Sequence, residues 1–238
     1  MNLYMLKKND GQGLIEYVFL IALITIGILL ALKLYGISVY DAYCYVGDKI
    51  SGSEACKPTE LCKDDFSTDL TGWKALQGNN MGVVNGGTLC PSSYTLMLNA
   101  CSVSEPLTDY VVTLSDANLK SGSGYGIAFR AQNTSTGMTG YVFQYDPGFS
   151  PGSFIIRKWV NGRELSTPIA VAKASGYSWY NTPRDIKIVI KGSTFTAYVD
   201  GKLVLTATDS TYATGGAGLR TWDSTIVCVD GFNIQYIP

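Results

Sequence analysis

The sequence predicts an α+β fold in which a long hydrophobic N-terminal helix precedes an antiparallel β-sandwich. Two observations support this prediction. Residues 11–32 read GQGLIEYVFLIALITIGILLAL and contain one charged residue, Glu16, whereas the chain from Asp64 onward alternates apolar and polar residues in short runs separated by Gly, Asn and Asp. The first pattern is typical of a helix long enough to cross a bilayer, and the second is typical of strands with one buried face.

Charge and residue content exclude several functions. The chain has 18 basic and 19 acidic residues and no basic cluster, so we expect no nucleic-acid partner. It has no histidine. A Ser-His-Asp triad and a histidine-ligated zinc site are therefore excluded.

The apolar segment is expected to form an assembly or transmembrane helix over residues 12–46, because the apolar spacing continues beyond Leu32 without a proline. A carboxylate such as Glu16 is costly in hydrocarbon unless it is paired. A plain membrane anchor with Lys7 and Lys8 on the inner side explains the length of the segment but leaves Glu16 unexplained. A cleaved secretory signal would need a small-residue cleavage site, which does not follow Leu32.

The stretch GQGLIEY at residues 11–17 resembles the N-terminus of type IVb pilins of the Flp/Tad kind, in which a glycine is followed by four residues and then Glu-Tyr. The resemblance implies that a prepilin peptidase cuts after Gly11, which makes residues 1–11 a leader peptide and Gln12 the first mature residue. Glu16 would then pair with the new amino group at Gln12 as subunits stack, and Glu16 and Tyr17 would be assembly residues. The alternative is a glutamate at the membrane interface near a helix N-terminus.

All six cysteines lie on the C-terminal side of the apolar segment. This arrangement predicts disulfides formed in an oxidising exterior, and the absence of a C-x2-C pair disfavours zinc. Local pairs Cys56–Cys62 and Cys90–Cys101 would leave Cys44 with Cys228, but other pairings stay open. The cysteines are Cys44, Cys56, Cys62, Cys90, Cys101 and Cys228. Residues 47–63 are expected to be a cysteine-containing connector.

The region 64–238 is expected to be a single β-sandwich. Alternating runs at 110–115, 125–131 and 141–146 predict strands, and Asn161-Gly162 and Asp200-Gly201 predict two-residue hairpin turns. No convincing helix intervenes, so the strands are expected to form two packed antiparallel sheets.

The order of motifs in this region resembles the concanavalin A-like jelly rolls, including laminin-G-like domains and the 3-keto-disaccharide hydrolase-like family. The matching stretches are DDFSTDLTGW, GYGIAFRAQ, GYVFQYD, YVDGKLV, GGAGLRTW and VDGFNIQYI. Val142 stands where the hydrolase-like relatives have a glutamate, and the E-x-D-x-x-E strand of laminarinase-type members is absent. The resemblance therefore implies the fold without the reaction, and we expect no enzymatic activity.

Strand alternation predicts a candidate glycan-binding face. The residues expected to face the core are Tyr125, Ile127, Phe129, Tyr141, Phe143, Tyr145, Phe154 and Ile156. The opposite face would then carry Arg130, Gln144, Asp146, Arg157 and Trp159. Planar hydrogen-bonding groups beside an indole suit a sugar ring. The alternative is a solvated sheet face or one covered by a neighbouring subunit. Trp73, Trp179 and Trp222 are expected to be core or loop anchors.

We expect no cofactor other than a structural calcium ion. Asp64, Asp65 and Asp230 come from the first and last strands, which lie side by side in such sandwiches, and carboxylate oxygens are the ligands calcium prefers. Ordinary surface carboxylates are the alternative.

The expected function is a pilin subunit that forms a homopolymer through its N-terminal helix and displays a lectin-like head. Such a subunit lies in the cytoplasmic membrane before assembly and afterwards in an extracellular pilus on the cell surface. One alternative is a membrane-anchored glycan-processing enzyme, and another is a minor pseudopilin that primes or caps a pilus.

Overall fold

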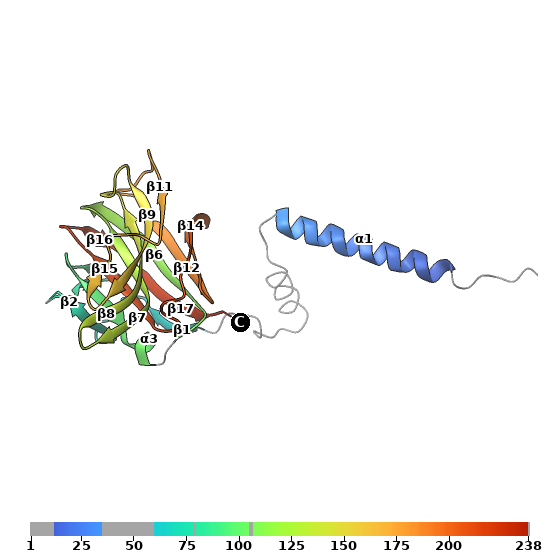
Figure 1. Ribbon diagram of the computed structural model, residues 1–238. Helices are drawn as coiled ribbons and strands as arrows, with labels where there is room; N and C mark the ends of the chain where they lie inside the picture. The colour runs from blue at the N-terminus through green and yellow to red at the C-terminus, as the bar shows by residue number, and fades with distance from the viewer. Residues whose placement is uncertain (1–11, 35–59, 79, 105–106, 238) are drawn as a thin grey trace, which may run out of the picture. The chain divides into compact units, whose positions relative to one another are not determined.

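The computed structural model describes residues 12–34, 60–78, 80–104 and 107–237. The chain divides into two compact units, Met1–Lys57 and Pro58–Pro238. The first contains helix α1 (Gln12–Leu34), and the second consists of antiparallel sheets, as the ribbon in Figure 1 shows.

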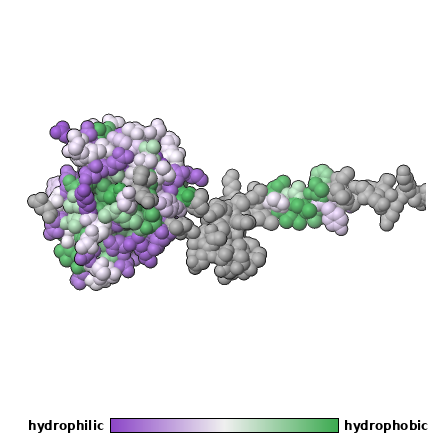
Figure 2. Space-filling view, turned by 90° about the horizontal axis from the view of Figure 1, so that it is seen from below, coloured by the Kyte–Doolittle hydropathy of each residue, from purple (hydrophilic) through white to green (hydrophobic). Residues whose placement is uncertain are grey.

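Helix α1 corrects the expected fold class. It has 23 residues, ends at Leu34, and its described side chains are largely exposed and hydrophobic (Figure 2). A fold class is set by the layers that share a core. Helix α1 and the sheets belong to different compact units of the chain. The expected α+β class, with a long hydrophobic helix over 12–46 as one of its two parts, is therefore wrong. The fold is an all-β sandwich.

Residues 35–46 of the expected helix, and most of the expected connector at 47–63, lie outside the described residues. Within the part of the chain that the structure describes, no helix combines the length and apolar character needed to cross a bilayer.

The smaller sheet follows the order β1-β17-β6-β12-β13-β14, and β16 also pairs with β6. Its strands are β1 (Glu60–Asp64), β6 (Tyr110–Ser121), β12 (Arg184–Lys191), β13 (Thr194–Val199), β14 (Lys202–Thr208), β16 (Ile226–Cys228) and β17 (Gly231–Tyr236). The first and last strands of the unit, β1 and β17, are neighbours as expected. β1 begins at Glu60, inside the range expected for the connector.

The larger sheet follows the order β10-β9-β8-β7-β15-β5-β2, and β11 also pairs with β9. Its strands are β2 (Trp73–Gln77), β5 (Leu96–Asn99), β7 (Tyr125–Thr134), β8 (Gly137–Asp146), β9 (Ser153–Val160), β10 (Arg163–Glu164), β11 (Ala170–Lys173) and β15 (Gly216–Thr221). A separate hairpin joins β3 (Gly82–Asn85) to β4 (Thr88–Pro91), and a one-turn helix, α3 (Ala100–Ser104), follows β5.

The core lies between the two sheets and is rich in aromatic residues. All eight residues expected to face inward on β7, β8 and β9 belong to it, which confirms the predicted alternation. Phe129 and Tyr141 of the larger sheet stack with ring centroids 5.4 Å apart. Both contact Phe195 of the smaller sheet, at 4.9 Å and 4.7 Å. Trp73 and Trp179 are also buried in this core, as expected.

The two predicted hairpin turns are confirmed. Asn161-Gly162 connects β9 to β10, and Asp200-Gly201 connects β13 to β14. Both residues of each turn have positive φ, between 50° and 76°. This conformation matches the right-handed twist of the flanking strands, and asparagine, aspartate and glycine tolerate it.

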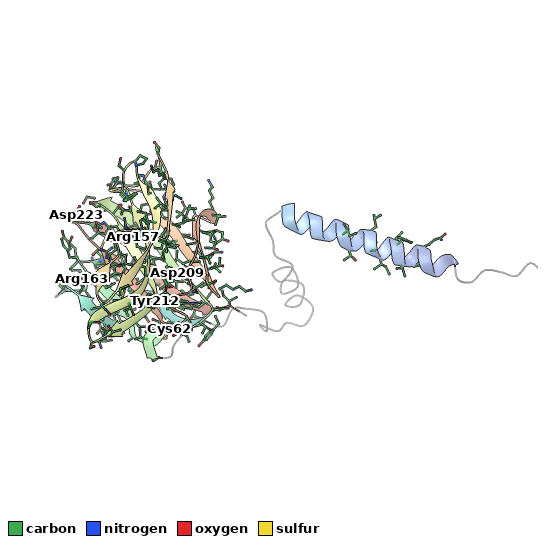
Figure 3. The ribbon with its side chains drawn as sticks, in the orientation of Figure 1. Cys62, Arg157, Arg163, Asp209, Tyr212 and Asp223 are labelled. Atoms are coloured by element: carbon green, nitrogen blue, oxygen red, sulfur yellow. A yellow bond between two sulfur atoms is a disulfide. The ribbon has the colours of Figure 1, made fainter. Side chains whose placement is uncertain are left out.

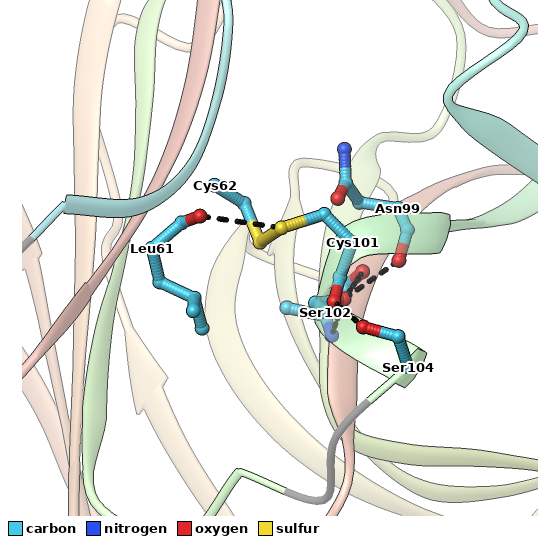
Figure 4. The surroundings of a disulfide bond; sticks show 7 residues. Leu61, Cys62, Asn99, Cys101, Ser102 and Ser104 are labelled. Carbon is cyan, nitrogen blue, oxygen red and sulfur yellow. Dashed lines mark hydrogen bonds between the residues drawn. A yellow bond between two sulfur atoms is a disulfide. The ribbon is translucent and has the colours of Figure 1, made fainter.

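Two disulfides tie distant segments together. Cys62 of β1 is bonded to Cys101 of α3 (Figure 4), and Cys90 of β4 is bonded to Cys228 of β16. The local pair Cys90–Cys101 is therefore not formed, nor is a pair of Cys62 with Cys56. The fold explains the pairing of Cys90 with Cys228, because Leu89 of β4 pairs with Val229, the residue after β16. This pairing brings the two cysteine-containing strands together. Cys44 and Cys56 lie outside the described residues.

The two disulfides are expected to stabilise the sandwich unequally. Cys90 and Cys228 are 138 residues apart in sequence, whereas Cys62 and Cys101 are 39 apart. A cross-link that closes a longer loop removes more entropy from the unfolded chain, so the double variant Cys90→Ala/Cys228→Ala should lose about 1 kcal/mol more unfolding free energy than Cys62→Ala/Cys101→Ala. Denaturant unfolding of both variants measures this difference, and equal or reversed losses would contradict the prediction.

Candidate functional site

The outer face of the larger sheet, opposite the core, contains an unusual mixture of apolar and charged side chains. We call its apolar part the outer apolar cluster, which comprises Leu96, Leu98, Ala128, Ala131, Met138, Val142 and Trp159. Val142, at the position where the hydrolase-like family has a glutamate, is fully buried there. This side of the sheet is therefore packed rather than merely solvated.

Beside these apolar residues lies a group of charged and amide side chains that we call the polar cluster. Its members are Gln144 and Asp146 on β8, Arg157 on β9, Glu164 on β10 and Arg220 on β15. Gly126 of β7 pairs with Gln144 on one side and with Arg220 on the other. A Cβ at Gly126 would lie 2.7 Å from a methyl carbon of Val142, so this position requires glycine. The absence of a side chain at residue 126 leaves room for those of Gln144 and Arg220.

Glu164 joins the members of the polar cluster. Its Oε2 accepts hydrogen bonds from Arg220 Nη1 at 2.7 Å and from Gln144 Nε2 at 2.8 Å. Its Oε1 lies 3.3 Å from Arg157 Nε, which also donates to Gln144 Oε1 at 3.1 Å. Arg157 (Figure 3) further donates through Nη1 to the carbonyl oxygens of Leu165 and Ser166. The segment that follows β10 therefore reaches the outer face and holds Arg157 in place.

Aromatic rings surround the two arginines. The Arg220 guanidinium lies 4.6 Å from the centroid of the Trp159 ring and 4.7 Å from that of the Trp222 ring. The Arg157 guanidinium lies 5.5 Å from the Phe149 ring. Trp159 is only 3% exposed, whereas Trp222 is half-buried and Phe149 is exposed. Trp159 therefore fixes Arg220 rather than offering an open ring, and Trp222 and Phe149 are the accessible aromatic groups.

Burial changes the acid–base behaviour of the polar cluster. It raises the pKa of Asp146 to about 6, against the lowering effects of the Phe149 backbone N–H and of Arg157. The nearby charge of Glu164 raises that pKa further. Burial also lowers the pKa of Arg220, although Glu164 and Asp146 act in the opposite direction. The carboxyl groups of Asp146 and Glu164 thus have different environments, because Glu164 contacts Arg157, Arg220 and the Gln144 amide.

Arg130 does not join the other four residues of the predicted face. The register of β7 against β8 shifts between Phe129 and Gln132, and Arg130 has a φ of 45°. This bulge breaks the alternation, so that Arg130 turns away and donates to the carbonyl oxygens of Thr108, Gly192 and Tyr212. It is buried, and its role in the described structure is to hold loops together.

The predicted calcium ligands are engaged in other contacts. Asp64 accepts hydrogen bonds from the Trp73 indole and the Phe66 backbone. Asp65 accepts one from the Ser67 backbone, and Asp230 accepts one from the Thr88 hydroxyl. Over the described ranges, no group of three or more acidic, cysteine or histidine side chains is arranged to hold a metal ion. Calcium binding stays a prediction.

The residues predicted for processing and assembly belong to the first unit. Gly11 lies outside the described residues, and Gln12 is the first residue of α1. Glu16 and Tyr17 are exposed on α1.

Sequence reasoning missed four residues of the site, namely Phe149, Glu164, Arg220 and Trp222. Glu164 directly follows the Asn161-Gly162 hairpin turn and lies in none of the alternating runs, and Trp222 is expected from the sequence to be a core or loop anchor. Arg220 had a usable signal, because in GGAGLRTW it alternates with the buried Leu219 on a strand. Only the pairing of β15 with β7, and of β7 with β8, shows that Arg220 lies across Gly126 from Gln144.

The geometry defines a β-sandwich with a charged, aromatic-flanked site on one sheet face, and comparisons with known proteins agree with this description. A levanase from Bacillus subtilis is 28% identical over 168 residues, which cover 68% of this chain. The chain spans only 22% of the levanase. No known protein family matches the chain.

The solved structures with similar folds include a carbohydrate-binding module and a glucanase. The carbohydrate-binding module CBM66 from Bacillus subtilis is 25% identical, with a TM-score of 0.53, over 68% of this chain and 96% of the module. The Bacillus licheniformis β-glucanase has a TM-score of 0.52 at 14% identity, over 74% of this chain and 98% of the enzyme. The likeness to the β-glucanase concerns the fold alone.

These comparisons correct the expected function. The sequence relative is a levanase, and the solved structure that is 25% identical is a carbohydrate-binding module; neither is a pilin. The interpretation as a Flp/Tad pilin subunit, with assembly into a pilus, is therefore wrong. The jelly-roll part of the resemblance is confirmed. The GQGLIEY motif covers few residues, whereas the jelly-roll motifs are individually weak but extend over a much longer region. The pilin interpretation gave too much weight to the short motif.

The raised pKa of Asp146 predicts a pH-dependent stability. The Asp146 carboxyl group binds its proton more tightly in the folded state than in the unfolded chain, where its pKa is near 3.8. The associated stability is therefore present below pH 4 and is lost as the pH rises through about 6. Asp146→Asn lacks this loss, so its unfolding free energy relative to wild type should rise by about 1–3 kcal/mol between pH 4 and pH 7.

Denaturant unfolding of both proteins across this pH range checks the prediction. Asp69→Asn is the control, because hydrogen bonds from Thr71 lower the pKa of Asp69. A lowered carboxyl pKa changes stability mainly below pH 4, so the difference between wild type and Asp69→Asn should stay nearly constant between pH 4 and pH 7. A difference between wild type and Asp146→Asn that stays constant with pH would contradict it.

Proposed function

We propose that the second unit binds carbohydrate through the polar cluster on the outer face of the larger sheet. The observation that supports this best is the fixed pair of arginines. Arg157 and Arg220 have side chains 10% and 14% exposed, and both are held by Glu164. Two guanidinium groups oriented in advance next to accessible aromatic rings suit a sugar, because its hydroxyls need planar hydrogen-bonding partners and its C–H face stacks on rings.

Hydrogen-bonding capacity remains for a ligand. Arg220 donates to Glu164 through Nη1, and among the described residues neither its Nε nor its Nη2 has a partner within hydrogen-bonding distance. The same holds for Nη2 of Arg157. Since the network already fixes these side chains, binding would cost little side-chain ordering.

The relatives suggest the first carbohydrate to test. A levanase, by its name, acts on levan, and the matching region of this chain covers most of the second unit. The likeness to a carbohydrate-binding module over 96% of that module supports binding as the role of such a unit. We therefore propose levan, or a related glycan, as the ligand. The two disulfides support a location in an oxidising compartment outside the cytoplasm.

Glycan hydrolysis is a second candidate function, and one observation favours it. Asp146, with its pKa near 6, resembles a general acid, while Glu164 forms ion pairs with two arginines. Glycoside hydrolases pair a carboxylic acid with a carboxylate in this way. Against this role, all of the Glu164 hydrogen bonds described above go to the protein, so its carboxylate is committed to positioning the arginines.

Binding is expected to depend on the polar cluster. In the full chain, Glu164→Gln and Arg220→Met should each weaken binding to levan by about tenfold or more, because each removes a charge-assisted contact worth at least ~1.4 kcal/mol. Affinity electrophoresis and titration calorimetry measure the effect, alongside a glycan panel.

Asp200→Asn is the matched control, because Asp200 forms a comparable ion pair with Arg184, at 2.6 Å, on a distant hairpin. It should bind as wild type does. The proposal fails if the wild type binds no glycan, or if Glu164→Gln binds as tightly as the control.

The same preparations separate binding from hydrolysis. Wild-type protein incubated with levan or β-glucan should release no reducing ends, because Glu164 is held by Arg157, Gln144 and Arg220. Release that disappears in Asp146→Asn and falls as the pH rises through about 6 would establish hydrolysis as the function.

A further inference from the structure

A hollow opens on the outer face of the larger sheet, away from the polar cluster. We call it the α3 pocket, because residues of α3 form one wall. It has a volume of about 360 Å³, and its lining includes Lys74, Leu76, Leu98, Val103, Gln132 and Asn133. This volume lies within the usual range for small-ligand sites, about 300–1,000 Å³.

The lining combines an apolar floor with a polar rim. Leu98 and Ala131 are buried members of the outer apolar cluster, and Leu76 packs against it. Lys74, Gln132 and Asn133 are exposed. An apolar floor offers contact to the C–H face of a sugar ring, and amide and ammonium groups at the rim offer hydrogen bonds to its hydroxyls.

One strand connects the α3 pocket to the polar cluster. β15 contributes Gly216 to the pocket and Arg220 to the cluster. At ~3.3 Å per residue these positions lie about 13 Å apart, the length of roughly three sugar units in a chain. The outer-face positions between them are Gly218 and its partner Ala128, which carry no charge and little bulk.

The wall of the pocket is held in place by covalent and hydrogen bonds. Cys101 of α3 is bonded to Cys62 of β1 (Figure 4). The buried Ser102 hydroxyl donates to the carbonyl oxygen of Asn99 and accepts from the Ala217 backbone N–H. A Cβ at Gly216 would lie 2.7 Å from Ser102 Oγ, so glycine is what lets α3 sit this close to β15. The pocket is therefore a fixed feature of the sandwich rather than a gap beside a loose segment.

We infer that the α3 pocket is a second carbohydrate subsite, and that one oligosaccharide of at least three units occupies it together with the polar cluster. This inference rests on the proposed function, since the polar cluster must bind the first sugar unit. It adds the class of ligand, which is a chain rather than a single sugar or a disaccharide.

The test uses a ladder of levan oligosaccharides, from two to eight units, titrated into the full chain. Affinity should rise at least tenfold between two units and about four or five, because only the longer chains reach both sites. Val103→Trp fills the pocket from its rim, where Val103 is 40% exposed. It should reduce the affinity for long chains to that for the disaccharide while leaving disaccharide binding unchanged.

Val83→Trp is the matched control, because Val83 is an exposed valine on the separate β3–β4 hairpin. It should keep the full dependence on chain length. Asn133→Trp fills the pocket from β7 and should repeat the result of Val103→Trp.

The outcomes distinguish the two proposals. If wild type binds the disaccharide and longer chains equally, or if both pocket-filling variants keep wild-type affinity for long chains, the second subsite is wrong and the polar cluster stands. If wild type binds no member of the ladder, the proposed recognition of levan fails and the subsite fails with it.

Discussion

Aromatic packing between the two sheets is the constraint on which the rest of the structure depends. Phe129 and Tyr141 of the larger sheet meet Phe195 of the smaller one, and all three rings are buried. Because side chains alternate along a strand, burying Tyr141, Phe143 and Tyr145 on β8 directs Val142, Gln144 and Asp146 to the outer face. A slip of one residue would reverse both faces, so the core also determines where the functional site lies.

The polar cluster shows how charged groups persist on a packed sheet face. Arg157, Glu164 and Arg220 are largely withdrawn from water, which is costly for ions. Their mutual contacts offset that cost, because Glu164 forms ion pairs with both arginines. The remaining guanidinium donors are left in fixed positions beside Trp222 and Phe149. This preorganisation is what connects the energetics of the face with its proposed role in binding.

The fold alone leaves the choice between binding and hydrolysis open. A carbohydrate-binding module and a β-glucanase both resemble this sandwich. Function on such a scaffold depends on which side chains occupy the sheet face. Val142 occupies the position where the hydrolase-like family that the sequence resembles has a glutamate. The carboxylates on this face are Asp146 of β8 and Glu164 of β10 instead. The environments of these two groups therefore matter more than the fold class.

The sequence by itself determined the local features. Alternation identified the inward-facing residues of β7, β8 and β9, and Asn161-Gly162 and Asp200-Gly201 identified two hairpins, because each signal depends only on residues adjacent in the chain. The tertiary structure decided the rest. The bulge that removes Arg130 from the face, the pairing of Cys90 with Cys228, and the meeting of Arg220 with Glu164 all depend on which strands become neighbours. Strand order is set by packing across the whole sandwich, and no short stretch of sequence records it.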